Sequence, residues 1–371
     1  MSKSNRYAAS QKLHSTALHS HWNSGHLTPS LGCQHCVYLD TCGTLQVRPG
    51  VFDCMTYCCC VDASSCDNVC PRNPAHLVAR EREVGGFQLN DVQAAPPVKV
   101  PPLPLVVPLI YHGSSRVRPL SVGVAALSLF SMFNKRDGTL RFATRRHLLD
   151  HFKLANDTKI ILSGTHEDSL LEAWWRLRDR EAIIRGLRKL GIVLVTTPNY
   201  SLFSDVPRPD NLFNMKRIAM VWSEFQREGI PCALHLNART DRDFERWTDF
   251  LREHPEITHV AFEFGTGAGA GRRISWHVDH LVSVTRAVRR PLHLIVRGGV
   301  AELRLLSNTF AGVTYIDTSA FVKALRRQRL VPRLDQLSAE CAPTPRGSPI
   351  DALLAENIAT VRGFVECRAT Q

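Results

Sequence analysis

Eight short apolar runs recur along the chain and are separated by turn residues or by helical patterns. The runs cover 105–111, 122–127, 159–162, 192–196, 231–236, 259–264, 291–296 and 313–316. Helical patterns cover 167–190, 211–228, 241–254, 275–290, 301–308 and 319–329. Apolar runs separated by single helices predict parallel strands with right-handed crossovers. Eight such strands favour an α/β fold of the TIM-like (β/α)₈ barrel type, although the first connection is too short for a regular βα unit; an open doubly wound sheet is the alternative.

The barrel is expected to occupy 100–333 of the 371 residues. Before it we expect a flexible N-terminus at 1–32 and a cysteine-rich metal-binding module at 33–95, and after it a C-terminal tail with a helix at 334–371. The N-terminus lacks the apolar region of a secretory signal. No window approaches the roughly 18 apolar residues of a membrane span. We therefore expect a cytoplasmic protein with no membrane partner.

Nine of the 12 cysteines fall between Cys33 and Cys70, at spacings that suit a shared metal ion. In a reducing compartment a metal site is favoured over the alternative of a disulfide framework. One Zn²⁺ with spare thiols, two Zn²⁺ or an iron–sulfur cluster all fit this number of thiols. The predicted ligands are Cys33, Cys36, Cys42, Cys54, Cys58, Cys66 and Cys70.

The chain carries a formal net charge of +12, and residues 270–333 hold 12 basic against 3 acidic residues. Such a concentration suits a polyanion such as nucleic acid, because neutralising phosphates releases condensed counterions. The alternative is a solvated basic helix surface. The candidates for phosphate contacts are Arg272, Arg273, Arg326 and Arg327.

Two acidic residues end predicted strands, where a barrel carries its chemistry. Asp317 follows an apolar run and precedes a basic helix, so it is a candidate nucleophile, a general base or simply the helix N-cap, and position alone favours the cap. Glu263 lies among apolar neighbours, where desolvation raises the pKa of a carboxyl group and suits it to proton transfer.

Four further residues follow predicted strands. Asn199 can hydrogen-bond the edge of a heterocycle and Tyr200 can stack on its face, although an Asx-type turn after Pro198 is the alternative. Gly298 and Gly299 open a helix, where backbone N–H groups can approach a phosphate or a base edge; a tight turn is equally compatible. Three histidines lie inside separate strands and are expected to be buried and hydrogen-bonded rather than to form a metal triad: His235, His259 and His293.

Segments 291–299, 312–319 and 323–327 resemble the last two strands of the tRNA-guanine transglycosylase superfamily, most closely the bacterial and phage branch that inserts deazaguanines into DNA. Segment 197–203 is similar to the family's base-recognition segment and to an uncharacterised prophage family. The resemblance implies that Asp317 is the nucleophile that attacks the glycosidic carbon and expels guanine. Two departures accompany it: Asn199 stands where relatives carry Asp, and these cysteines precede the barrel whereas the family's zinc site lies near its C-terminus.

The expected function is therefore that of a transglycosylase-like enzyme, a pentosyltransferase that acts on DNA or tRNA. Asp317 would attack C1′ of a guanosine, while Glu263 and Asn199 contact the base. Two other classes remain open: a non-catalytic, metal-stabilised nucleic-acid-binding protein, and a metal- or iron–sulfur-dependent enzyme acting on a small anionic substrate. A steep salt dependence of binding separates nucleic-acid ligands from a small substrate.

Overall fold

The computed structural model of the chain describes residues 46–47, 50–51, 80–203, 208–265, 273–345 and 347–370. The chain divides into two compact units. The first comprises Met1–Asp91, Tyr200–Ala219 and Asn237–Arg246, and the second comprises Val92–Asn199, Met220–Leu236 and Trp247–Gln371. All eight strands of the main sheet belong to the second unit, which we call the barrel unit.

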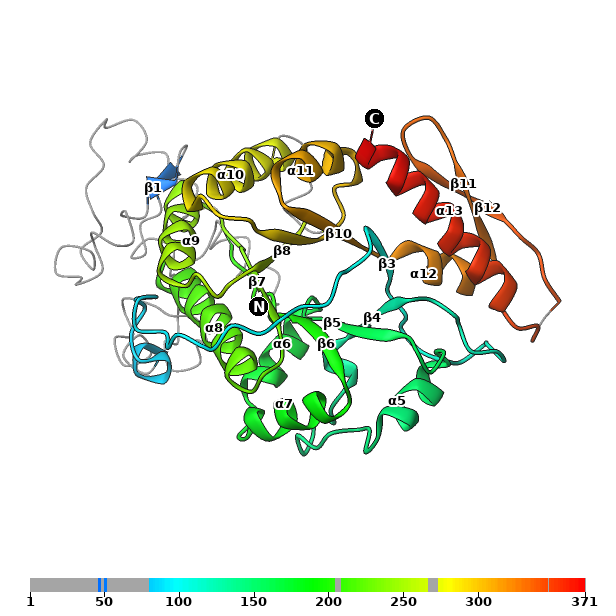
Figure 1. Cartoon of the computed structure of the whole chain (residues 1–371), viewed down its shortest axis with the longest axis horizontal. Coiled ribbons are helices and arrows are strands. Elements are labelled where there is room, and N and C mark those ends of the chain that lie inside the picture. Colours follow the sequence, from blue (N-terminus) through cyan, green and yellow to red (C-terminus); the bar gives the residue numbers. More distant parts are fainter. Residues whose placement is uncertain are drawn as a thin grey trace, which may run out of the picture. The chain divides into compact units, whose positions relative to one another are not determined.

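The predicted apolar runs form one eight-stranded parallel sheet (Figure 1). Its strands are β3 (Val106–Pro108), β4 (Val124–Ser128), β5 (Lys159–Ser163), β6 (Ile192–Thr196), β7 (Cys232–His235), β8 (His259–Glu263), β9 (His293–Arg297) and β10 (Gly312–Asp317). Their order is β3-β10-β9-β8-β7-β6-β5-β4. Between β3 and β4 a single parallel bridge pairs Leu109 with Ala126, and the Ile110 N–H donates to the Ala126 carbonyl at 2.9 Å. The TIM-like barrel prediction is thus confirmed as a nearly closed ring.

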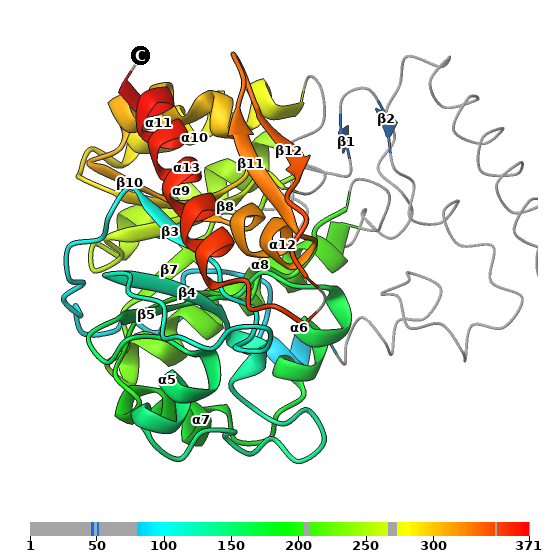
Figure 2. The same cartoon turned by 90° about the vertical axis from the view of Figure 1, so that its right-hand side faces the viewer.

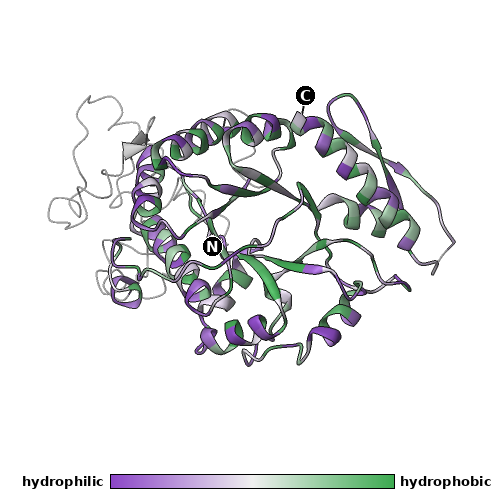
Figure 3. Ribbon diagram, in the orientation of Figure 1, coloured by the Kyte–Doolittle hydropathy of each residue, from purple (hydrophilic) through white to green (hydrophobic). Residues whose placement is uncertain are grey.

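Every strand contributes to the apolar interior of the barrel, and Figure 3 shows the hydrophobic colouring of the central strands. The interior cluster consists of Val107, Leu109, Val124, Ala126, Ile161, Leu194, Ala233, Ala261, Ile295 and Ile316. Alternate positions along parallel strands point into a barrel, so the branched side chains fill it and the alanines fit where space is short. The polar ends of the strands therefore lie above a packed core rather than a pore.

Helices follow most of the strands. They are α5 (Arg145–Phe152), α6 (Asp168–Trp175), α7 (Arg180–Lys189), α8 (Arg208–Arg227), α9 (Asp241–Glu253), α10 (Arg273–Val288), α11 (Leu303–Thr309) and α12 (Ser319–Leu325). The single helix predicted over 167–190 is wrong, because it is divided into α6 and α7. The Asp179 side chain accepts the Ala182 N–H at 2.8 Å and so starts a new helix. The first connection, 109–123, contains no helix, as its length predicted.

The helix predicted to run to residue 329 ends at Leu325, which corrects the sequence expectation. Arg327 takes a left-handed conformation with φ 54°, and the chain then enters β11 (Gln328–Pro332). This strand pairs antiparallel with β12 (Leu337–Cys341), and α13 (Asp351–Thr370) packs on β11 and α12. Figure 2 shows α13 lying beside this hairpin. The segment expected as a tail with a helix thus holds both β12 and α13.

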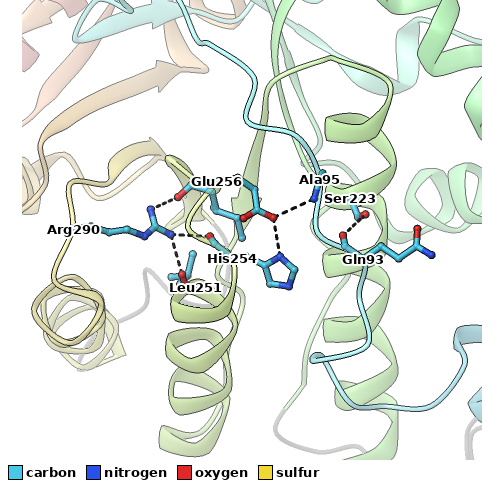
Figure 4. A network of polar contacts seen from close by, with 8 residues as sticks. Gln93, Ala95, Ser223, Leu251, His254, Glu256 and Arg290 are labelled. Atoms are coloured by element: carbon cyan, nitrogen blue, oxygen red, sulfur yellow. Dashed lines mark hydrogen bonds and ion pairs between the residues drawn. The ribbon is translucent and has the colours of Figure 1, made fainter.

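A buried polar network holds the end of α9 (Figure 4). Arg290 donates from Nη2 to the carbonyl oxygens of Leu251 and His254, each at 3.0 Å. These are carbonyls that a helix terminus leaves without partners. Glu256 Oε1 lies 2.9 Å from His254 Nδ1 and accepts the Ala95 N–H at 3.2 Å. The network therefore links the segment around Ala95, which leads into β3, to the end of α9.

In the first unit, the guanidinium of Arg217 lies over the rings of Tyr200 and Phe213, at 4.0 and 4.5 Å from their centroids. A two-residue strand, β1 (Gln46–Val47), pairs antiparallel with β2 (Gly50–Val51). The predicted metal ligands from Cys33 to Cys70 lie outside the described residues, so the zinc or iron–sulfur site stays a prediction. No helix in the described part of the chain is long and apolar enough to cross a membrane.

Candidate functional site at the carboxyl end of the barrel

Seven of the eight barrel strands end in a polar residue, and the candidate site is built around four of them: Ser163 in β5, Glu263 in β8, Arg297 in β9 and Asp317 in β10. Because the strands are parallel, their carboxyl ends meet at one end of the barrel. We call it the carboxyl end. In barrel enzymes this is the end that carries the chemistry, so it is where the candidate site is built.

Arg297 reaches across this end. Its Nη1 donates to Ser163 Oγ at 3.4 Å and to the carbonyl oxygen of Thr165 at 3.3 Å. The strand order separates β9 from β5 by four steps in a ring of eight, so these strands lie opposite one another. The guanidinium therefore lies over the centre of the barrel rather than at its rim.

Glu263 is the partner of Arg297. Its side chain is 4% exposed, and Oε2 lies 3.1 Å from Nε of Arg297, while Oε1 accepts the Gly265 N–H at 2.6 Å. Burial raises the pKa of Glu263 above its ordinary value, although the Arg297 charge and the Gly265 N–H act in the opposite direction.

Asp317 is buried, and both of its oxygens accept hydrogen bonds from the start of α12. Oδ1 accepts from the backbone N–H and the hydroxyl of Ser319 at 2.8 and 2.6 Å, and Oδ2 accepts the Ala320 N–H at 3.0 Å. Burial raises the pKa of Asp317, while these hydrogen bonds lower it. The contacts match the capping alternative, and they also hold the carboxylate in one orientation.

Two tyrosines lie within the electrostatic reach of this group. Burial raises the pKa of Tyr315 to about 12, and the charges of Asp317 and Glu263 add to that rise. Burial also raises the pKa of Tyr111, where the Arg297 charge opposes it and the two carboxylates reinforce it. Tyr111 is nevertheless 41% exposed. Both hydroxyls therefore stay protonated at neutral pH and can donate hydrogen bonds.

His235 is buried at the end of β7, as expected from the sequence. Its Nδ1 lies 2.6 Å from the Thr197 carbonyl oxygen, and its Nε2 lies 3.5 Å from Thr165 Oγ1. Burial lowers the pKa of His235 to about 3, so the ring is neutral. A carbonyl only accepts, so Nδ1 carries the proton and Nε2 presents its lone pair toward the Thr165 hydroxyl.

The other two strand histidines, His259 and His293, begin β8 and β9 and so lie at the opposite end of the barrel. Their rings stack, with centroids 4.9 Å apart. Within the described ranges no group of three or more His, Cys, Asp or Glu side chains is placed to hold a metal ion.

Asn199 and Tyr200 fall in different units. The Asn199 backbone N–H donates to the Gly164 carbonyl at 2.9 Å, and its buried side-chain Oδ1 has no hydrogen-bond partner among the described residues. Tyr200 is 1% exposed, and Arg217 covers one face of its ring. Their roles in binding a base stay predictions.

Gly298 and Gly299 make the turn after β9, with φ of 71° and 66°. A Cβ at Gly298 would lie 2.7 Å from the Gly265 backbone nitrogen, and one at Gly299 would lie 2.7 Å from the ring of Phe264. Both positions therefore need glycine for the tight turn, the alternative that the sequence left open. The turn fixes where Arg297 leaves its strand.

Several basic residues of segment 270–333 make hydrogen bonds or ion pairs within the chain, which the sequence did not indicate. Arg273 and Arg326 are exposed, Arg327 donates to the Ser348 carbonyl, and Arg272 lies outside the described residues. Of the 11 basic residues of this cluster that the structure describes, five bind acceptors of the chain itself: Arg290, Arg297, Arg327, Arg329 and Arg333. Moreover, α12 begins beside Asp317 and runs away from it, so Arg326 lies about 10 Å along that helix.

Sequence reasoning did not nominate Tyr111 or Tyr315 as site residues, and it included Arg297 only as part of the segment with the glycine pair, without a role of its own. Arg297 stands directly before the glycine pair, and Tyr111 ends the first apolar run, so a strand-end position was the available signal. Their proximity to Glu263 and Asp317 follows from strand pairing: β8 pairs with β9 with Glu263 opposite Arg297, and β3, which precedes Tyr111, pairs with β10.

No protein-family model matches the chain, and no curated protein matches it. Among solved structures, the chain is similar to one described as the "crystal structure of a putative lyase/mutase from Burkholderia cenocepacia J2315". The two share 15% sequence identity over 67% of this chain and 88% of the other, with a TM-score of 0.33. A similarity of this size concerns the fold alone and carries no argument about activity.

Proposed function

We propose that this chain is a nucleic-acid-modifying enzyme that cleaves the glycosidic bond of a guanine-type nucleoside. One observation carries the proposal: two buried carboxyl groups, Glu263 and Asp317, end strands on either side of β9 at the carboxyl end of the barrel. Burial raises the pKa of both groups. Most enzymes that hydrolyse glycosidic bonds use a pair of carboxyl groups held in different environments.

The two carboxyl groups would take different roles. Asp317, ionised and oriented by Ser319 and Ala320, attacks the sugar C1′ and forms an ester bond there. The bond from C1′ to the base breaks, the electron pair leaves with the base nitrogen, and that nitrogen takes up a proton from solvent, while ionised Glu263, paired with Arg297, contacts the base. A water molecule or a second base then attacks C1′ and releases Asp317. Water gives excision, and a second base gives exchange.

Nucleic acid is the proposed polymer because the barrel unit is rich in exposed arginines without an ion-pair partner among the described residues. Arg273 is the first residue of α10 and Arg304 the second residue of α11, the helices that follow β8 and β9. Helices that follow barrel strands begin at the carboxyl end, so these two cations lie on the side of Glu263 and Asp317. Contacts with phosphates there would position the polymer.

The decisive experiment traps the covalent intermediate. We expect the full-length protein to form an adduct with guanine-containing DNA or tRNA that survives denaturing electrophoresis, and Asp317→Asn to abolish it. Asp249→Asn, at an exposed acid of α9, is the matched control and should leave the adduct unchanged. Thermal unfolding of each variant checks that loss of the adduct is not loss of fold.

A second function is favoured by the hydrogen bonds of Asp317. Because its two oxygens serve as the cap of α12, the barrel is also compatible with a non-catalytic nucleic-acid-binding protein. In that case no adduct forms with either polymer, Asp317→Asn binds like wild type, and affinity falls steeply with salt. That combination of results would replace the enzyme proposal.

A further inference from the structure

The pair formed by Arg297 and Glu263 has unused hydrogen-bonding capacity. A guanidinium carries five N–H donors, and among the described residues only Nη1 of Arg297 has hydrogen-bond acceptors. Nε of Arg297 and Oε2 of Glu263 form an ion pair at 3.1 Å, yet both are buried atoms without a well-aligned hydrogen bond. Open donors and an open acceptor therefore lie side by side, and buried polar groups of this kind normally have partners.

We propose that this pair binds the amide edge of a planar heterocycle, with the ring carbonyl oxygen accepting from Arg297 and the adjacent ring N–H donating to Glu263. The inference rests on the proposed function, because that function brings a guanine-type base to this end of the barrel. It adds the two residues that select the base, Arg297 and Glu263.

The chemistry of the two purine edges decides the selection. Guanine and hypoxanthine carry a carbonyl at C6 beside the N1–H, an acceptor next to a donor. Adenine carries an amino group there beside an unprotonated N1, which is the opposite order. Arg297 only donates and ionised Glu263 only accepts, so adenine would place a donor against a donor and an acceptor against an acceptor. A buried mismatch of this kind is costly.

The local charges favour a neutral ligand over an anion. The charge of Arg297 is already paired with Glu263, and Asp317 ends the adjoining strand β10. An anionic group would add a further negative charge beside two carboxyl groups, which like-charge repulsion disfavours. A lactam ring fills the open donors and acceptor without adding charge.

Tyr111 offers a face for the same ring. It is one of the few large hydrophobic side chains in the described residues that are well exposed, at 41%, and the charges of Arg297, Glu263 and Asp317 all act on its hydroxyl. Stacking on an aromatic ring binds any base, whereas the Arg297 and Glu263 pair would read its edge. Mutating Tyr111 therefore tests the stacking, and mutating Arg297 or Glu263 tests the contacts to the base edge.

The test is a calorimetric titration of the full-length protein with guanosine, inosine, adenosine and inorganic phosphate. We expect guanosine and inosine to bind with similar affinity and adenosine to bind at least about tenfold more weakly. Arg297→Lys keeps the charge but loses the planar fork, and Glu263→Gln replaces a charged carboxylate by a neutral amide with one acceptor oxygen and one donor nitrogen; each should weaken guanosine binding about tenfold or more. Arg329→Lys, in the exposed ion pair with Glu356, is the matched control and should bind like wild type.

Tyr111 supplies an independent variant pair. Tyr111→Phe should retain guanosine binding and its preference over adenosine, whereas Tyr111→Ala should weaken both nucleosides together, because it removes stacking and leaves the edge contacts. Should Arg297→Lys fail to fold, as thermal unfolding will show, Glu263→Gln and the Tyr111 pair carry the test.

Three results overturn the inference: equal affinity for guanosine and adenosine, no binding of guanosine, or phosphate binding that Arg297→Lys removes. The covalent-adduct assay separates these failures from failure of the proposed function. A protein that selects guanosine but forms no adduct keeps this inference and loses the enzyme proposal. A protein that forms the adduct but does not distinguish guanosine from adenosine keeps the enzyme proposal and loses this inference.

Discussion

Asn357 in α13 accepts a hydrogen bond at Oδ1 from the backbone N–H of Leu330 in β11, at 2.8 Å. The same side chain, with no exposed area, donates from Nδ2 to the carbonyl oxygens of Gln328 at 3.0 Å and Ala320 at 3.4 Å. One buried amide thus joins α13 to the strand and the helix that follow Asp317.

Replacing this amide should destabilise the protein. Asn357→Ala leaves a buried N–H and two carbonyl oxygens without their partner, so we expect the free energy of unfolding to fall by about 2–3 kcal/mol. Urea denaturation measures the change. Asn308→Ala, at an exposed position of α11, is the control and should shift stability by less than about 0.5 kcal/mol. Equal effects of the two substitutions would contradict the role assigned to Asn357.

Gly164 allows the ends of β5 and β6 to approach one another. A Cβ there would lie 2.3 Å from the Thr197 carbonyl oxygen and 2.4 Å from that of Thr196. Gly164→Ala should therefore force the strands apart and lower the free energy of unfolding by about 1–3 kcal/mol. At Gly123 a Cβ meets nothing within 4 Å, so Gly123→Ala should not destabilise the protein comparably. Thermal unfolding of both variants decides it, and a Gly164→Ala protein as stable as the control would refute the close approach.

The cap formed by Asp317 has a measurable stability. Asp317→Ala removes the acceptors of the Ser319 and Ala320 N–H groups, so we expect a loss of about 1–2 kcal/mol. Asp317→Asn keeps a capping oxygen and should lose less. Comparing these variants by urea denaturation separates the cap from any catalytic role, since only the adduct assay responds to a nucleophile. Equal stability of Asp317→Ala and wild type would mean that the cap contributes nothing.

The stacked histidines at the amino end of the barrel predict a pH dependence. Burial, with the neighbouring His293, lowers the pKa of His259 to about 3, and burial also lowers the pKa of His293. The unfolded chain therefore takes up protons that the native protein does not. Stability should be full above about pH 6.5 and should fall as the pH drops below it, with about one proton bound per histidine on unfolding.

The measurement is the free energy of unfolding between about pH 7.5 and 4.5. His259→Gln removes one of the two shifted groups, so its stability should decline less steeply with falling pH than that of wild type. His147→Gln, at an exposed site in α5, is the matched control and should keep the wild-type slope. A His259→Gln slope identical to wild type would exclude the pair as a source of the pH dependence.

The cysteine spacing predicts bound metal. Elemental analysis of anaerobically purified protein should find zinc, or iron together with a brown colour, and Cys36→Ser should lower the metal content. The exposed Cys367 of α13 lies far along the sequence from the cluster, so Cys367→Ser is the control and should leave the metal content unchanged. Protein that holds no metal, and that Cys36→Ser does not alter, would reject the prediction.

The sequence by itself determined the strands and most of the helices. The apolar run at 192–196 coincides with β6, and 241–254 matches α9 to within one residue, because period-two and period-3.6 patterns are local properties of the chain. It also placed Glu263 and Asp317 at strand ends, and so at one end of a parallel barrel. The sequence did not reveal the break between α6 and α7, because the periodic pattern continues through it. There the Asp179 side chain caps α7.

Only the tertiary structure decided which of those residues act on one another. Arg297 and Ser163 lie 134 positions apart, and their contact exists because the ring brings β9 opposite β5. The pairing of β8 with β9 sets Glu263 opposite Arg297, and the pairing of the first strand β3 with the last strand β10 brings Tyr111 within reach of both charges. Burial and pairing depend on what surrounds a side chain in space, and the hydrophobic pattern of a segment does not specify its neighbours from distant strands. The strand ends were therefore readable from the sequence, whereas the charge pair across them was not.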